Sequence, residues 1–256
     1  MSKAQTTLSK RSRLDTLLFD RGLARSREAA RASVLASAVR VDGAAVTRPS
    51  ALVAATASLE VVSPPRFVSR GGEKLADALT AFAIDVAGKT CVDVGSSTGG
   101  FTDCLLQNGA RRVYAVDVGY GLLDYRLRQD ERVRVMERTN ARDLPPLPEA
   151  CDLAVIDVSF IGLEKVIPAV ERSLKPGGEI VCLVKPQFQA RREEVGKRGV
   201  VRDPQVHAAV IGRVVAWAAG RGLRLLGLTT SPLVGPAGNK EFFLHLQLPE
   251  RRRADV

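Results

Sequence analysis

The sequence predicts an α/β fold: a doubly wound, mostly parallel, seven-stranded sheet that follows a small α+β domain. From residue 71 onward, short apolar segments alternate with amphipathic helical ones, which is typical of a parallel sheet covered by helices on both faces. The last two predicted strands have no helix between them, so they should pair antiparallel at one edge. Positive charge is concentrated before residue 70, which sets the first part of the chain apart.

The first domain, predicted over residues 1–63, contains two helices and a small sheet. Leucines at helical spacing indicate the first helix, and Gly22 suits its end. Ser26 is a good N-cap for the second helix. Alternating apolar residues around the turn at Asp42 and Gly43 predict a hairpin followed by another short strand. The predicted elements are helices 13–21 and 27–37 and strands 39–41, 45–47 and 59–62.

A linker is predicted over residues 64–70, because Pro64 and Pro65 remove backbone donors and favour extended geometry. The second domain, residues 71–256, is expected to begin with a helix and then to alternate strands and helices. Its predicted elements are helices 72–83, 100–108, 162–174 and 203–221, a turn at 175–178, and strands 90–94, 112–117, 132–137, 152–157, 179–184, 223–231 and 241–248.

Charge is distributed unevenly along the chain, whose net charge is +10. Residues 1–70 hold 12 Lys and Arg against 5 Asp and Glu, whereas the remaining 186 hold 26 against 23. A basic domain suits a polyphosphate partner, although a solvated basic surface would have the same composition. Aromatic residues are scarce, so a structured RNA bound through its backbone and shape fits better than stacked single-stranded bases. The candidate RNA-binding residues here are Arg13, Arg25, Arg27, Arg31 and Arg70.

Several kinds of protein are disfavoured by the composition. No apolar run approaches the roughly 18 residues needed to cross a bilayer, and no apolar segment follows the basic amino terminus, so we expect neither a membrane protein nor a secretory signal. The four cysteines lack C-x-x-C spacing and the two histidines are far apart, so we expect no metal site and no disulfide framework. We expect a monomer in a reducing cytoplasm.

A glycine-rich turn joins the first strand of the second domain to its helix. Glycines let a ligand approach the backbone, and the helix start offers free N–H groups. Asp117, at the end of the next strand, is placed to bind a ribose diol. A dinucleotide site would need a glycine at Ser97, whereas Asp93 suits S-adenosylmethionine, whose ammonium and sulfonium are cations. The candidate cofactor-binding residues are Asp93, Gly95, Ser96, Ser97, Thr98, Gly99, Gly100, Phe101, Asp117 and Asp143.

The role of Asp143 stays open at this point. It follows the third strand and could accept a hydrogen bond from an adenine amino group. An aspartate in a turn before Pro145 and Pro146 is equally often a local turn former.

Ionisable residues from distant parts of the sequence are expected at the sheet edge where ligands bind. Asp157 and Lys185 end two parallel strands. Glu241 begins the antiparallel last strand at the same edge, and Lys74 lies in the preceding helix. Methylation of an alcohol needs a general base, because the hydroxyl must lose its proton as the methyl group transfers. We assign Lys185 as the base and Lys74 as a neighbouring cation that favours the neutral amine, while Asp157 and Glu241 orient them.

The motifs of both domains resemble known families. Residues 11–62 resemble the αL RNA-binding domain named after the fourth small-subunit ribosomal protein, through residues 13–15, 22–30 and 39–43. The catalytic set looks like the Lys-Asp-Lys-Glu tetrad of FtsJ-like RNA 2′-O-ribose methyltransferases, which have a Rossmann-like fold. Nearly the whole chain is similar to the TlyA family, and the matching motifs lie at 68–75, 99–102, 117–121, 138–142, 184–188 and 231–241.

The resemblance implies methylation of cytidine ribose in ribosomal RNA. It also implies that the basic domain binds the RNA of a ribosomal subunit. Members of the family are often labelled hemolysins, but nothing in the chain supports membrane lysis. The loop 187–202 carries the remaining candidate RNA contacts, Arg191 and Arg192, although it could be a solvated surface loop. Two other functions stay open: a methyltransferase of a protein or small molecule, and a non-enzymatic RNA-binding factor of ribosome assembly.

Overall fold

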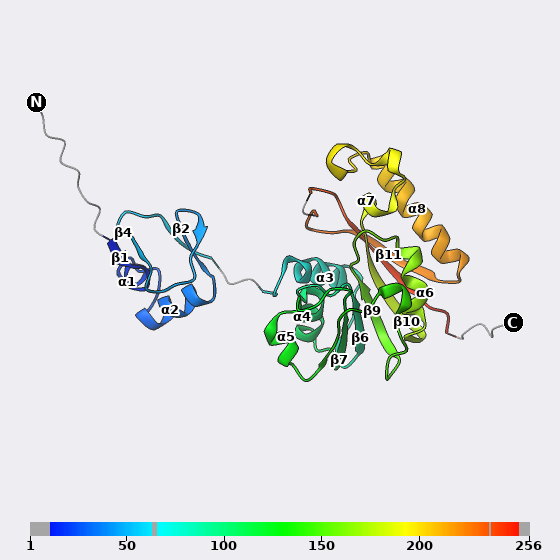
Figure 1. Ribbon diagram of the computed structural model, residues 1–256, viewed down its shortest axis with the longest axis horizontal. Helices are drawn as coiled ribbons and strands as arrows, with labels where there is room; N and C mark the ends of the chain where they lie inside the picture. The colour runs from blue at the N-terminus through cyan, green and yellow to red at the C-terminus, as the bar shows by residue number, and fades with distance from the viewer. Residues whose placement is uncertain (1–10, 63–65, 236, 251–256) are drawn as a thin grey trace, which may run out of the picture. The chain divides into compact units, whose positions relative to one another are not determined.

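The computed structural model describes residues 11–62, 66–235 and 237–250 (Figure 1). The chain divides into two compact units, one that runs to Arg66 and one that begins at Phe67. Each unit has a hydrophobic core of its own. Within the described residues, no helix combines the length and the apolar character needed to span a membrane.

The smaller unit packs α1 (Leu14–Asp20) and α2 (Arg27–Leu35) against a three-stranded antiparallel sheet. Fully buried leucine, alanine and valine side chains from both helices and one strand form its core. Ser26 caps α2, as the sequence predicts, because its hydroxyl accepts a hydrogen bond from the Ala29 N–H at 3.1 Å. The strands are, in sheet order, β3 (Ala44–Ala45), β2 (Val39–Val41) and β5 (Leu59–Val61).

A second sheet in the smaller unit is absent from the sequence prediction. It consists of β1 (Arg11–Arg13) paired antiparallel with β4 (Leu52–Ala54). Each strand has three residues, and the Arg-Ser-Arg sequence of β1 has no apolar alternation from which a strand could be predicted. Arg13 therefore belongs to a strand, and the first helix begins one residue later than expected.

The larger unit is built on a seven-stranded sheet of order β11-β12-β10-β9-β6-β7-β8. The strands from β10 to β8 in that order are parallel, and β12 runs antiparallel to both β10 and β11. The doubly wound, mostly parallel sheet and the antiparallel last strands are thus confirmed. The strands are β6 (Thr90–Val94), β7 (Arg112–Val116), β8 (Val133–Met136), β9 (Cys151–Ile156), β10 (Leu174–Val184), β11 (Arg224–Thr230) and β12 (Phe242–Gln247).

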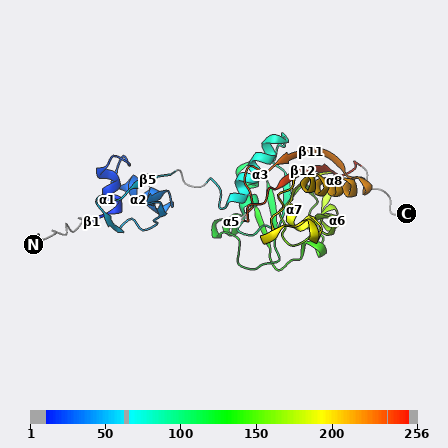
Figure 2. The same cartoon turned by 90° about the horizontal axis from the view of Figure 1, so that it is seen from above.

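Helices cover both faces of this sheet (Figures 1 and 2). Those on one face are α3 (Arg70–Ala81), α4 (Gly100–Gln107) and α5 (Tyr125–Gln129), and those on the other are α6 (Ile167–Glu171) and α8 (Pro204–Gly220). Leu75 and Leu105 are fully buried on the first face, and Ile167 and Val210 on the second. Figure 2 shows α8 lying beside β11 and β12. Burial on both faces explains why the central strands are mostly apolar.

Short helical segments account for most differences from the predicted elements. The helix expected over 162–174 is a 3₁₀ turn, η2 (Leu163–Lys165), followed by α6, which ends at Glu171. Pro168 lies in the first turn of α6, and its missing N–H prevents a continuous helix from η2 onward. Two helices, α5 and α7 (Pro186–Gln189), are not predicted from the sequence, because they are too short to show helical periodicity.

The linker predicted over 64–70 extends too far. Phe67 is 3% exposed and packs in the core of the larger unit, and α3 begins at Arg70 rather than 72. Residues 64 and 65 lie outside the described residues. A single apolar residue after two prolines gives no pattern from which its burial could be predicted.

The topology gathers several chain segments at one edge of the sheet. The carboxyl ends of β6, β9 and β10 lie there because these strands are parallel. The antiparallel β12 begins at the same edge, where Val184 lies opposite Phe242. Lys185 and Glu241, the next residues outward, are therefore held close together.

Candidate active site

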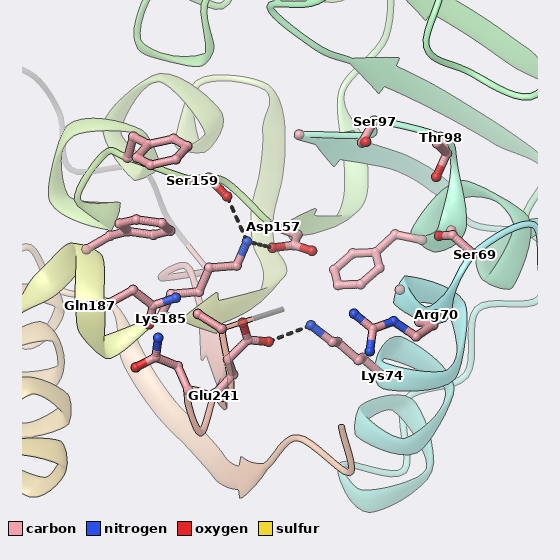
Figure 3. A pocket seen from close by; sticks show the side chains of 18 of the residues that line it. Ser69, Arg70, Lys74, Ser97, Thr98, Asp157, Ser159, Lys185, Gln187 and Glu241 are labelled. Carbon is pink, nitrogen blue, oxygen red and sulfur yellow. Dashed lines mark hydrogen bonds and ion pairs between the residues drawn. The ribbon is translucent and has the colours of Figure 1, made fainter. Parts of the chain in front are cut away.

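Two lysines and two carboxylates line a cavity of about 690 Å³ at this edge (Figure 3). They form two ion pairs. Lys74 Nζ lies 2.5 Å from Glu241 Oε2, and Lys185 Nζ lies 2.5 Å from Asp157 Oδ1. The structure thus brings together the four residues that sequence analysis singled out from distant parts of the chain.

The pair of Lys74 and Glu241 is the more deeply buried one, with side chains 9% and 1% exposed. Lys74 projects from α3, and Glu241 directly precedes β12. Gly235 leaves room for the carboxylate, because a Cβ at that position would lie 2.6 Å from Glu241 Oε1. Buried charges are tolerated when they are paired, so each side chain fixes the other.

The pair of Lys185 and Asp157 is held by neighbouring strands. Asp157 follows β9, and its N–H donates to the Val94 carbonyl at 2.9 Å. Lys185 follows β10, and its Nζ also donates to Ser159 Oγ at 3.1 Å. A carboxylate and a hydroxyl therefore hold an amine that faces the cavity (Figure 3).

The glycine-rich turn after β6 forms another wall of the cavity. Gly95 has a φ of +88°, and a Cβ there would lie 2.4 Å from the Asp157 carbonyl oxygen, so no side chain fits. Gly99, with a φ of +96°, caps α4 and packs against leucines instead of lining the cavity. The residues of the turn and of α4 that do line it are Gly95, Ser96, Ser97, Thr98, Gly100 and Phe101.

A second cavity, of about 730 Å³, adjoins the first and shares Gly95, Ser97 and Asp157 with it. Asp117 lines this second cavity, together with residues 139–142. Its carboxylate accepts hydrogen bonds from the backbone N–H groups of Ser97 at 2.8 Å and Gly119 at 2.7 Å. The two cavities together give room for an elongated ligand that crosses the glycine-rich turn.

Asp143 lines neither cavity, so its candidate role as an adenine acceptor stays a prediction. It is exposed at the end of the 3₁₀ turn η1 (Ala141–Asp143), and its N–H donates to the Asn140 carbonyl at 2.9 Å. The alternative interpretation, a local turn former, agrees with this geometry. Its neighbours Asn140, Ala141 and Arg142 line the second cavity instead.

Asp93 also lines neither cavity, so its contact with a cofactor cation stays a prediction. It is fully buried on β6, where Oδ2 accepts a hydrogen bond from the Thr102 hydroxyl at 2.6 Å and Oδ1 has no partner. Burial raises the pKa of Asp93 to about 7, although the Thr102 hydrogen bond opposes this shift. The position of Asp93 near a strand end predicted that it lies near this edge of the sheet. It did not predict that the side chain is fully buried.

Several cavity residues are missing from the sequence prediction. Ser159 and Phe160 lie two and three residues after Asp157, so their place after a strand end was an available signal. The Phe160 ring lies 4.7 Å from that of Phe188, and both line the first cavity. Asn239 lies two residues before Glu241, within the motif at 231–241, and also lines this cavity.

The predicted basic residues differ in their surroundings. Arg25, Arg27 and Arg31 are exposed on or just before α2. Arg13 is held by Asp15 through hydrogen bonds of 3.0 and 2.6 Å, which reduces the charge it offers to a ligand.

In the larger unit, Arg191 and Arg192 are exposed but line neither described cavity. Arg70 lies at the rim of the first cavity (Figure 3), and Arg198, which was not among the predicted contacts, lines it as well. The described residues gather no three histidine, cysteine, aspartate or glutamate side chains in a group that could hold a metal ion.

Comparisons with known proteins agree on the nature of both units. The FtsJ-like methyltransferase family matches residues 67–248, and the S4 domain matches residues 12–57. The chain is 50% identical over 248 residues to YqxC of Bacillus subtilis, which is provisionally named an rRNA methyltransferase, with 94% of this chain and 87% of that protein covered. It is 48% identical over 244 residues to the 16S/23S rRNA (cytidine-2′-O)-methyltransferase TlyA of Mycobacterium tuberculosis, with 94% and 91% covered.

A solved structure from Streptococcus thermophilus, provisionally named a hemolysin, is similar over nearly its whole length. It superimposes with a TM-score of 0.73 at 42% identity and covers 97% of this chain and 92% of that chain.

Proposed function

Because the chain belongs to the FtsJ-like methyltransferases, we propose that it transfers a methyl group from S-adenosylmethionine to the ribose 2′-hydroxyl of a cytidine in ribosomal RNA. The observation that carries this proposal is the convergence of two lysine–carboxylate pairs on one cavity beside a glycine-rich turn. A ribose hydroxyl is a poor nucleophile, and such a site offers it both a base and positive charge.

The residues of the two cavities fit S-adenosylmethionine. Gly95 lines both cavities with backbone alone, because a Cβ there would lie 2.4 Å from the Asp157 carbonyl oxygen. Asp117 keeps acceptor capacity toward ribose hydroxyls, because each carboxylate oxygen has a second lone pair beyond its backbone hydrogen bond. The carboxylate of Asp157, at the junction of the two cavities, suits a ligand that carries positive charge. When bound, S-adenosylmethionine supplies the electrophilic methyl group.

Lys185 would act as the general base. In its neutral form, Nζ would accept the proton of the 2′-hydroxyl as that oxygen takes the methyl group. Asp157 Oδ1, 2.5 Å away, stabilises the ammonium that forms, and Ser159 limits the directions in which the amine can point. The carboxylate would stabilise the charged ammonium more than the neutral amine. It therefore stabilises the transition state more than the resting state, and this lowers the barrier.

Lys74 would stabilise the negative charge that develops on the attacking oxygen. Its ammonium is fixed by Glu241 at 2.5 Å, with the lysine side chain 9% exposed at the cavity wall. Holding the 2′-hydroxyl beside the bound methyl donor would supply much of the remaining rate.

The smaller unit would bind the RNA. It matches the S4 domain and presents Arg25, Arg27 and Arg31 to solvent. Neutralising phosphates with arginine releases counterions, so this contribution to affinity should weaken as salt rises. A ribosomal substrate places the protein in the cytoplasm.

Incubation of the protein with ribosomal subunits and tritiated S-adenosylmethionine tests the proposal. After nuclease digestion, we expect the label in 2′-O-methylcytidine. Label on a base, in protein or in a small molecule would contradict the proposal and favour the alternative methyltransferases. Failure to bind S-adenosylmethionine in calorimetry would favour a non-enzymatic assembly factor.

A further inference from the structure

We propose that Asn239 is a positioning residue that ties the basic loop, residues 191–202, to the segment that carries Glu241. This inference rests on the proposed methyl transfer and adds to it a connection between the loop and the ion pair of Lys74 and Glu241. The connection consists of side-chain hydrogen bonds to the backbone of residues 199–201.

Asn239 is 1% exposed, and both ends of its amide are satisfied. Oδ1 accepts a hydrogen bond from the Val201 N–H at 2.9 Å, and Nδ2 donates to the Gly199 carbonyl at 3.0 Å. These partners lie 38 and 40 positions away in the sequence. A buried amide with a donor and an acceptor bound in this way has one orientation, so it fixes residues 199–201 in one place.

A second buried side chain holds the same segment. His207 of α8 is 6% exposed, and its Nε2 donates to the Val201 carbonyl at 3.0 Å. The imidazole also packs edge-on against Phe242, the first residue of β12, with ring centroids 5.4 Å apart. Val201, itself 2% exposed, thus has both backbone groups bound by side chains that contact or adjoin the start of β12.

On its other side, Asn239 is close in sequence to Glu241. The Asn239 carbonyl accepts from the Gly235 N–H at 2.9 Å, and the Glu241 carbonyl accepts from the Ser231 N–H at 2.9 Å. These bonds close the turn that delivers Glu241 to Lys74. A shift of Asn239 would therefore move the carboxylate that orients Lys74.

The segment that Asn239 holds reaches the cavity. Arg198 and Gly199 line the same cavity as both lysine–carboxylate pairs. Arg198 is exposed, so its guanidinium is available to a phosphate of bound RNA. Asn239 thus links the position of the Arg198 guanidinium to the position of Lys74. This link would place bound RNA correctly for methyl transfer.

The first test uses Asn239→Ala in the full chain, with Asn108→Ala as the control. Asn108 also donates through its side-chain amide to a backbone carbonyl, that of Cys104 at 2.8 Å, but lines neither described cavity. Loss of a buried hydrogen bond should raise the exchange rate of the Val201 amide about tenfold in Asn239→Ala only. An unchanged exchange rate in Asn239→Ala would overturn the connection, and this readout needs no methylation.

Asn239→Asp separates the two hydrogen bonds. Its carboxylate can still accept from Val201 but cannot donate to Gly199, so protection of the Val201 amide should be retained while methylation slows. We expect a higher KM for RNA and a lower kcat, with an unchanged Kd for S-adenosylmethionine. A Kd that weakens as much as KM rises would indicate a general loss of structure and overturn the positioning role.

A double-mutant cycle between Asn239→Ala and Arg198→Ala tests the coupling. Arg198→Ala should raise the KM for RNA about fivefold in the wild-type background and less than twofold in the Asn239→Ala background, since residues coupled through one backbone segment are not additive. Equal effects in both backgrounds would overturn the proposal. A wild-type protein that methylates no RNA would instead overturn the proposed function and the positioning role with it, whereas the exchange measurement would still report on the hydrogen bonds.

Discussion

Replacing Glu241 by glutamine should destabilise the protein, because it leaves the buried ammonium of Lys74 without a charged partner. The variant deprives Lys74 of its partner at a position where the lysine side chain is 9% exposed. Breaking a buried ion pair from one side costs about 3–5 kcal/mol, and because water reaches Lys74 through the cavity we expect about 3 kcal/mol. For a unit of this size, that corresponds to a Tm lower by roughly 6–12 °C. Scanning calorimetry of the unfolding transition measures it.

A matched control is Glu171→Gln, which removes the partner of Arg221. Those side chains are 18% and 39% exposed at 2.8 Å, so the loss should stay under about 1 kcal/mol. Adding Lys74→Met to Glu241→Gln removes the unpaired charge and should recover most of the stability without recovering methylation. If Glu241→Gln melted at the wild-type temperature, Lys74 would not depend on its partner and the reasoning about this pair would be wrong.

Three further outcomes are expected. Burial raises the pKa of Asp93 from 3.8 to about 7, so the folded state holds this proton more tightly than the unfolded one. The free energy of unfolding of the wild type should therefore fall relative to that of Asp93→Asn by up to about 4 kcal/mol between about pH 4 and pH 7, and urea titrations showing a constant difference would refute this. Gly95→Ala places a Cβ 2.4 Å from the Asp157 carbonyl oxygen at a φ of +88°, so calorimetry should give an S-adenosylmethionine affinity at least about tenfold weaker, and wild-type affinity would contradict the close approach. Arg27→Ala combined with Arg31→Ala should flatten the dependence of log RNA affinity on log salt by about 1–2, and an unchanged slope would remove these arginines from the RNA contacts.

The sequence was most informative where a residue type at a given backbone position usually has a single structural role. Ser26 before a helical pattern predicted the N-cap of α2. Acidic and basic residues at strand ends predicted which side chains meet at the edge of the sheet, because parallel strands and a doubly wound topology leave few alternatives. The four residues of the two ion pairs were therefore accessible from the sequence.

Properties that depend on depth and tertiary contacts were not accessible. Asp93 and Asp117 both lie at strand ends, but only the structure separates a fully buried carboxylate from one that lines a cavity. Arg13 and Arg27 are both arginines of a basic domain, and only the structure shows that Asp15 engages the first. The connection through Asn239 joins segments some forty residues apart, a distance over which local pattern carries no information.

The rate of methyl transfer under single-turnover conditions tests the assignment of Lys185 most directly. The comparison is between Lys185→Ala and Lys175→Ala, since Lys175 forms an ion pair of the same 2.5 Å length with Asp152 at the opposite edge of the sheet. With saturating S-adenosylmethionine and RNA, Lys185→Ala should slow transfer by about 10²–10⁴ and Lys175→Ala by less than about twofold. Equal rates in Lys185→Ala and the wild type would contradict the assignment of this amine as the base.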